Sequence, residues 1–99
     1  MTEPPRDRIP AHPGQILRGE LIGRNMTQKE LAEATGRPYQ AISLIVTGKK
    51  RITADTAIDL EEALDIDAEF WLRAQFAHQL AHELAQARRR RAASTRAMG

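Results

Sequence analysis

Residues 26–43 read MTQKELAEATGRPYQAIS, and this stretch decides the fold. Thr27 and Glu30 have the three-residue spacing of a capping box, which predicts that a short helix begins here. The helix is predicted to end at Gly36, because glycine adopts the left-handed conformation of a helix end without strain. The side chains that we expect to be buried on this helix are Leu31 and Ala34.

A second short helix is predicted after a tight turn. Pro38 suits the first position of a helix, since its missing N–H is not needed there. The helix is expected to end at Thr47 and Gly48 and to bury Ile42 and Ile45, which lie at helical spacing.

The two helices and their turn describe a helix-turn-helix, in which the later helix enters the major groove of DNA. Ala32 is small enough for the two helices to approach closely. A generic helical hairpin uses the same turn chemistry, but the combination of features here is too specific for that alternative. These features are Gln28, the pair Leu31 and Ala32, Gly36, and Gly48 with the lysines that follow it.

Helices are also predicted on both sides of this motif, and no strand pattern occurs in the sequence. Pro13 begins the preceding helix, while Thr53 and Asp67 cap two helices that follow. The expected fold class is therefore all-α, with five helices of which the last, C-terminal one is long. The apolar residues at helical spacing on the first and fourth helices are Ile16, Leu17, Leu21, Ala57, Leu60 and Leu64.

One domain is expected, because 99 residues leave too little apolar surface for a second core. Residues 1–12 carry prolines among charges and are predicted to form a flexible arm. The DNA-binding domain is expected over residues 13–87 and a basic, disordered tail over residues 88–99. No apolar run is long enough to cross a bilayer and the N-terminal residues do not resemble a signal peptide, so we expect a cytoplasmic protein without a membrane partner.

The fifth helix carries two neighbouring apolar stripes that cover about 220° of its circumference. Because this arc is wider than one contact requires, we expect one stripe to pack on the bundle and the other on a second copy of the chain. The alternative is that the whole arc packs internally. The first stripe is Leu72, Phe76, Leu80 and Leu84. The second is Phe70, Ala74, Ala77, Ala81 and Ala85.

Charge is distributed unevenly, although the formal net charge is only +2. Every charged residue between Glu33 and Asp55 is positive, whereas no Lys or Arg occurs from Asp55 until Arg73. A protein with one positive and one negative surface can bind a polyanion on the first without repulsion along the second. The acidic stretch is either a surface for a basic protein partner or a solvated face. The basic run over residues 88–91 either contacts nucleic acid or forms a solubilising end, and we favour the solubilising end.

No catalytic or metal-binding motif emerges from the sequence. His78 and His82 have a spacing that can bind zinc, but they share a polar face with three glutamines and no third ligand is evident. The absence of cysteine excludes thiolate sites and disulfides, and no glycine-rich phosphate loop occurs. We therefore expect no enzymatic activity, metal or cofactor. The three glutamines are Gln75, Gln79 and Gln86.

The motif with its continuation Val46-Thr47-Gly48-Lys49 resembles the lambda-repressor-like, or XRE, family. Three further segments resemble the HigA-type antitoxins within that family, and the match covers approximately residues 12–85. The resemblance implies a homodimer that binds a palindromic operator in its own promoter and neutralises a HigB-like toxin, an mRNA-cleaving nuclease of the RelE fold. The segments are His12-Pro13-Gly14-Gln15-Ile16-Leu17, Ile52-Thr53-Ala54-Asp55-Thr56-Ala57 and Glu69-Phe70-Trp71-Leu72.

The resemblance also implies DNA contacts at particular positions. Gln28 matches the family's phosphate-clamping glutamine. Tyr39 and Gln40 are expected to face base edges, where Gln40 can pair with an adenine. The hydroxyls of Ser43 and Thr47 can meet bases or phosphates. The cations expected at the DNA backbone are Arg37, Lys49, Lys50 and Arg51.

Leu44 departs from the family pattern, since many relatives carry a polar or charged residue there; it either touches a thymine methyl group or only packs. Two other functions stay open. A stand-alone XRE transcriptional regulator without a toxin would share every DNA contact, and an interaction module would use the bundle as an adaptor. The basic residues around the recognition helix argue against the adaptor. We therefore predict an antitoxin that represses its own operon.

Overall fold

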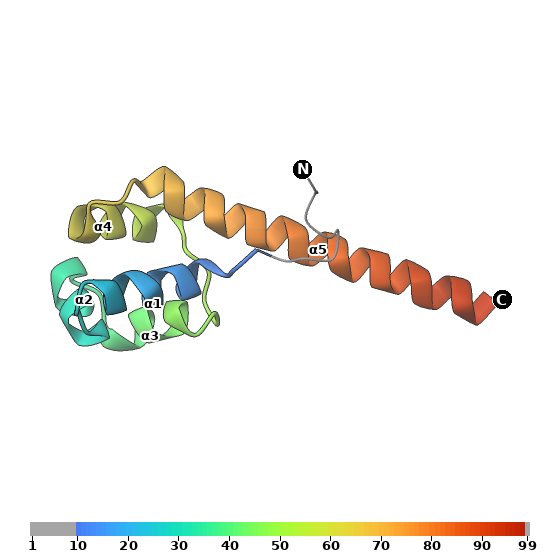
Figure 1. Ribbon diagram of the computed structural model, residues 1–99, viewed down its shortest axis with the longest axis horizontal. Helices are drawn as coiled ribbons and strands as arrows, with labels where there is room; N and C mark the ends of the chain where they lie inside the picture. Colours follow the sequence, from blue (N-terminus) through green and yellow to red (C-terminus); the bar gives the residue numbers. More distant parts are fainter. Residues whose placement is uncertain (1–9, 99) are drawn as a thin grey trace.

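The computed structural model describes residues 10–98, which form five α-helices with no strand among them (Figure 1). The all-α expectation is confirmed. Residues 1–9 of the expected arm lie outside the described residues. None of the helices in the described part combines the length and apolarity that crossing a bilayer requires. The helices are α1 (Pro13–Gly23), α2 (Gln28–Thr35), α3 (Tyr39–Val46), α4 (Ala54–Leu64) and α5 (Ala68–Met98).

The ends of α2 and α3 follow the local signals, with small shifts. Thr27 Oγ1 accepts from the Glu30 N–H, and Glu30 Oε1 accepts from the Thr27 N–H, both at 3.0 Å. The bond from the Thr27 backbone, followed by that with the Thr27 side chain, holds the pKa of Glu30 below its ordinary value. Gly36 ends α2 with a φ of 70°. Pro38 is the N-cap of α3 and not its first residue, so this helix begins at Tyr39.

The start of α1 packs tightly against α3. Gly14 is required there, because a Cβ at this position would overlap the carbonyl oxygen of Ile45. His12 caps the helix, since its Nδ1 accepts from the Gly14 N–H at 2.9 Å. His12, which the sequence predicts to lie in the flexible arm, therefore belongs to the folded bundle.

A single core joins the helices, and on α2 it differs from the expectation. Ala34 is exposed, whereas Ala32 is buried beside Leu31. Ala34 lies about 200° around the helix from Ala32 and so points away from the other helices. The buried apolar residues are Leu17, Leu21, Leu31, Ala32, Ile42, Ile45, Val46, Ile52, Ala57, Leu60, Leu64 and Trp71.

The inward face of α5 follows neither of the two predicted apolar stripes along its length, although Leu72 of the first packs against the core and Ala85 of the second is buried. Trp71 is fully buried, and Gln75 is buried one turn later, where its Oε1 accepts from the Ile52 N–H at 2.8 Å. Phe76 and Leu80 are 56% and 61% exposed. The prediction that the whole arc packs internally is therefore wrong, and no complete stripe packs on the bundle. The bundle takes the face that supplies an acceptor to the loop between α3 and α4.

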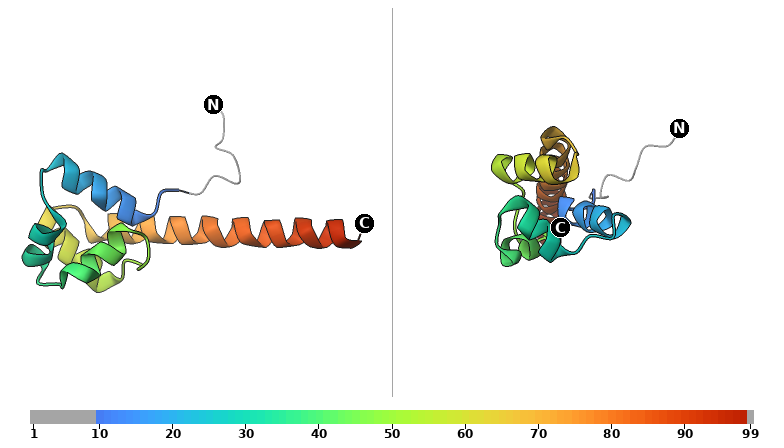
Figure 2. Two further views of the ribbon diagram at one scale, coloured as in Figure 1. Left: turned by 90° about the horizontal axis from the view of Figure 1, so that it is seen from below. Right: turned by 90° about the vertical axis from the view of Figure 1, so that its left-hand side faces the viewer.

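The C-terminal part of α5 extends beyond the other four helices (Figure 2). A disordered tail is expected from residue 88, but the helix continues to Met98. Its side chains over residues 88–95 are exposed. The radius of gyration is 16.7 Å, whereas a compact domain of this size has about 13 Å. The projecting helix accounts for the difference.

Candidate nucleic-acid interface

The outward face of α3 carries the residues predicted to read DNA bases. Tyr39 is 54% exposed, Gln40 is exposed and Ser43 is half-buried. Leu44, at 42% exposure, lies among them, and the four residues line a shallow hollow of about 310 Å³. The opposite face of α3, which includes Ile42, is buried in the core. The structure thus brings Tyr39, Gln40 and Ser43 together on one solvent-facing surface.

Thr47 has a more restricted role than the sequence indicates. Its Oγ1 donates to the Ser43 carbonyl oxygen at 2.8 Å and lies 3.3 Å from that of Leu44. A hydroxyl has one proton, so Thr47 in this position can accept a hydrogen bond from a base but has no proton for a phosphate.

The loop after α3 presents three exposed cations, Lys49, Lys50 and Arg51. Gly48 turns the chain with a φ of 78°, and the N–H groups of Lys49 and Lys50 donate to the Leu44 carbonyl oxygen at 2.8 and 3.1 Å. The backbone of the loop is therefore fixed to the end of α3, while its side chains extend into solvent. Cations at this end also offset the negative end of the helix dipole.

Gln28 is the first residue of α2, at the end of the helix where backbone N–H groups lack partners within the helix. Its Oε1 is buried and has no hydrogen-bond partner within residues 10–98. The Nε2 end of the amide is a donor of the kind that a phosphate oxygen accepts. The position of Gln28 at the start of α2 is compatible with the clamping role, which stays a prediction.

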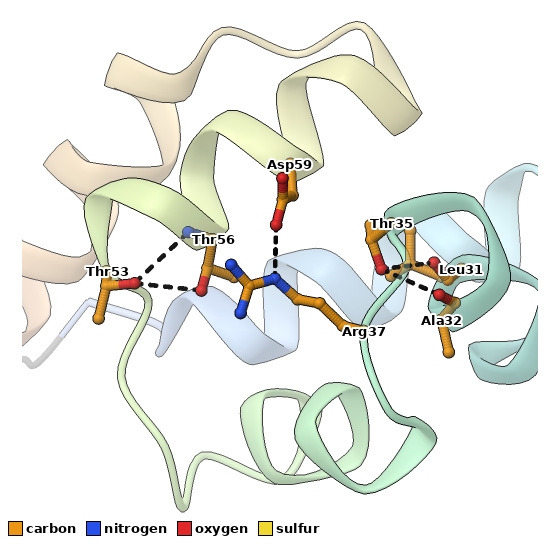
Figure 3. Close-up of polar contacts among 7 residues, drawn as sticks. All are labelled: Leu31, Ala32, Thr35, Arg37, Thr53, Thr56 and Asp59. Atoms are coloured by element: carbon orange, nitrogen blue, oxygen red, sulfur yellow. Dashed lines mark hydrogen bonds and ion pairs between the residues drawn. The ribbon is translucent and has the colours of Figure 1, made fainter.

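Arg37 forms an ion pair that the sequence does not indicate. Its Nε donates to Asp59 Oδ2 of α4 at 2.6 Å (Figure 3). The pair fixes the turn between α2 and α3 to α4, and because it is partly exposed its contribution is about 1 kcal/mol or less. Arg37 therefore has a structural role, and its contact with the DNA backbone stays a prediction.

The acidic stretch does not form one free surface. Glu61 Oε2 accepts from the Ala68 N–H at 2.7 Å, which satisfies a backbone group at the start of α5, and Asp59 is engaged by the arginine. Asp55 and Glu62 are exposed and lie seven residues apart on α4, which places them on one face. The other exposed carboxylates of the stretch are Asp65, Asp67 and Glu69.

Of the two histidines predicted to lie on a solvated polar face, His82 is exposed, whereas His78 is half-buried and contacts the residues before α1. His78 Nδ1 lies 2.8 Å from the carbonyl oxygen of Pro10, and the ring of His78 contacts that of His12. Within residues 10–98, no three His, Asp or Glu side chains are arranged to hold a metal ion.

Known proteins are similar to this chain in both sequence and fold. A family model described as Helix-turn-helix matches residues 17–71. Virulence-associated protein A of Dichelobacter nodosus is 41% identical over 75 residues, which cover 72% of this chain and 72% of the relative. Antitoxin HigA-1 of Vibrio cholerae is 38% identical over 74 residues, which cover 74% of this chain and 70% of the relative.

A solved structure, the Pseudomonas aeruginosa antitoxin HigA with the higBA promoter, matches with a TM-score of 0.77 and 34% sequence identity. The match covers 82% of this chain and 89% of that one. The matched family segment contains α2, α3 and α4 in full, and with them the exposed face of α3. The resemblance drawn from the sequence is confirmed: the chain belongs to the helix-turn-helix family and, within it, to the HigA antitoxins.

Proposed function

We propose that this protein is a sequence-specific DNA-binding antitoxin, which represses its own operon and neutralises a HigB-like, mRNA-cleaving toxin. The observation that carries the proposal is the exposed surface of Tyr39, Gln40 and Ser43 on α3, directly followed by a loop of exposed cations. The HigA relative solved with promoter DNA supports the same assignment. The protein acts in the cytoplasm by binding alone, without enzymatic activity, metal or cofactor.

In this mechanism α3 enters the major groove, where Gln40 pairs with an adenine and Tyr39 and Ser43 contact neighbouring base edges. Lys49, with the other cations of its loop, neutralises phosphates and supplies affinity that depends on salt. Gln28 donates to a phosphate from the start of α2 and so fixes the orientation of the module.

The protein acts as a homodimer through the outward face of α5. Phe76, Leu80 and Leu84 are exposed on this face, and a second copy is the occupant that DNA reading requires. One module covers a single half-site, whereas a dimer places two recognition helices about 34 Å apart on the same side of the DNA. A contact between identical α5 faces buries both apolar surfaces at once.

A gel shift with the promoter of its own operon tests DNA binding. Gln40→Ala is expected to cost about 1 to 3 kcal/mol against the operator and to relax discrimination at one base pair. Lys49→Ala is expected to weaken binding to all sequences and to reduce the salt slope by about one unit. Gln86→Ala, on an exposed part of α5, is the matched control. Unchanged operator affinity in Gln40→Ala would exclude α3 as the reading helix.

Rescue of cells from a co-expressed toxin tests the second activity. Asp55→Lys with Glu62→Lys reverses the free acidic face of α4 and is expected to slow association with a basic nuclease. Glu61 is unsuitable for this test, because its carboxylate holds the Ala68 N–H. Operator binding by the double variant checks that the fold is intact. Full rescue by that variant would show that this face of α4 does not contact the toxin. If the wild type itself does not rescue the cells, the protein is a stand-alone regulator and not an antitoxin.

A further inference from the structure

The three histidines of the chain lie together. The rings of His12 and His78 meet edge to face with their centroids 5.0 Å apart, and those of His78 and His82 stack at 6.1 Å. His12 precedes α1, whereas the other two lie on α5, so the tertiary fold creates the cluster. Any proton that an imidazole exchanges in this protein is therefore exchanged at this one place.

Two neighbouring hollows open beside the cluster, with volumes of about 290 and 610 Å³, and share His12, Gly48 and His78. Both lie next to the loop that follows the recognition helix. None of the described residues that line them is Asp or Glu. The charged or titratable residues that line them are His12, Arg18, Lys49, Arg51, His78 and His82.

The charge of this region suits an anion. Arg18 comes from α1 and Lys49 and Arg51 from the loop, and the positive end of the α1 dipole lies beside them at His12. Burial, followed by the charge of His78, lowers the pKa of His12. On α5, Glu83 accepts a hydrogen bond from Gln79 and does not line the hollows. A phosphate group would find cations and N–H donors here without a facing carboxylate.

The hydrogen bonds single out one ring as the site of proton uptake. The Pro10 carbonyl can only accept, so His78 carries its hydrogen on Nδ1 and keeps a lone pair on Nε2. The Nδ1 of His12 accepts from Gly14, and the Nε2 of His82 accepts from the Gln86 amide at 3.1 Å. A proton at either of these acceptors breaks a hydrogen bond, whereas a proton on His78 Nε2 breaks none and creates a donor.

We propose that this histidine-lined groove binds a phosphate of the DNA backbone and that His78 takes up a solvent proton on Nε2 as it does so, which makes operator affinity rise as the pH falls. The inference rests on the proposed DNA-binding function. It extends the phosphate contacts from the loop after α3 to α5. The phosphate oxygen accepts from the new N–H while Lys49 and Arg51 balance its charge.

Operator affinity measured by fluorescence anisotropy from about pH 6 to about pH 8, at constant ionic strength, tests the inference. The wild type is expected to bind more tightly at the acidic end, by at most about tenfold per pH unit for one proton. His78→Gln is expected to bind as the wild type does at the alkaline end and to show no pH dependence. His82→Gln, the matched control, keeps the pH dependence.

A flat wild-type profile, or an unchanged slope in His78→Gln, overturns the inference. Lack of operator binding at every pH overturns the proposed function instead. NMR titration of the three ring Hε1 signals provides a measurement on the unmodified chain: the His78 signal is expected to report proton uptake when operator DNA is added. If that signal responds to inorganic phosphate and not to the DNA, the groove takes a free anion and the inference fails.

Discussion

The two faces of α5 are not arranged as their polarity would suggest. A glutamine lies on the buried inward face, whereas large apolar side chains lie on the exposed outward face. The inward face places a glutamine, Gln75, beside Trp71 and is buried against α1, α4 and the loop before α4. The outward face carries Phe76 and Leu80 and is exposed. The loop before α4 explains the difference, since the Ile52 N–H would have no acceptor if an apolar stripe covered it.

The apolar pattern of α5 indicates how much of the helix is covered, but it does not indicate which face packs on the rest of the chain. In this helix the buried face is the one that carries Gln75, because its side chain supplies the acceptor for the Ile52 N–H. The remaining apolar face is then available to another molecule. Three substitutions on α5 test this division, and they are ordered by their expected effect on the stability of the fold.

Trp71→Ala is expected to have the largest effect, a loss of about 3 to 5 kcal/mol of unfolding free energy, because it leaves a cavity in the core. Urea denaturation followed by circular dichroism measures it. Phe76→Ala is the matched control on the outward face: its effect is expected to depend on protein concentration, since the proposed dimer places its contacts with a second copy. An equal, concentration-independent loss in both variants would contradict the division into two faces.

Gln75→Leu is expected to cost about 1 to 3 kcal/mol although it makes the helix more apolar, because the buried Ile52 N–H loses its acceptor. The same denaturation experiment measures the loss. Gln79→Leu, one turn further along and only half-buried, should change stability little. A more stable Gln75→Leu variant would show that area alone decides the packing of this face.

Leu80→Lys is expected to have the smallest effect on the fold, within about 0.5 kcal/mol, since the side chain is exposed in one copy of the chain. It should instead separate the dimer, because two lysines would have to be buried at the contact. Sedimentation or light scattering at micromolar concentration distinguishes the two species, with Gln86→Lys as the control. A wild type that is already a monomer, or a variant that remains a dimer, would leave the outward face without a partner.

Much of the fold follows from signals that lie close together in the chain. The capping box of Thr27 and Glu30 and the left-handed Gly36 fix α2 through contacts over a few residues. The exposed positions of Tyr39 and Gln40 also follow from helical periodicity on α3. These predictions succeed because the interactions that decide them are local.

The candidate site was less predictable where side chains meet across the fold. Arg37 has the sequence context of a DNA-backbone cation, yet Asp59 engages it from α4. Glu61 has the context of a free acidic face, yet it holds the Ala68 N–H. Neither interaction can be predicted from the spacing of residues in the sequence, because a charged side chain can either face solvent or bind a group that is distant in the chain.

The sequence by itself determined that the chain forms helices, where most of them begin, and which residues on α3 face outward, since caps and periodicity act within one or two turns. Only the tertiary structure decided which face of α5 is buried and that the three histidines meet. Gln75 contacts Ile52, and His78 contacts His12, across long stretches of chain. Such contacts depend on how the helices pack, because a backbone N–H or an imidazole ring can interact with many kinds of residue and only the packing decides which one is near.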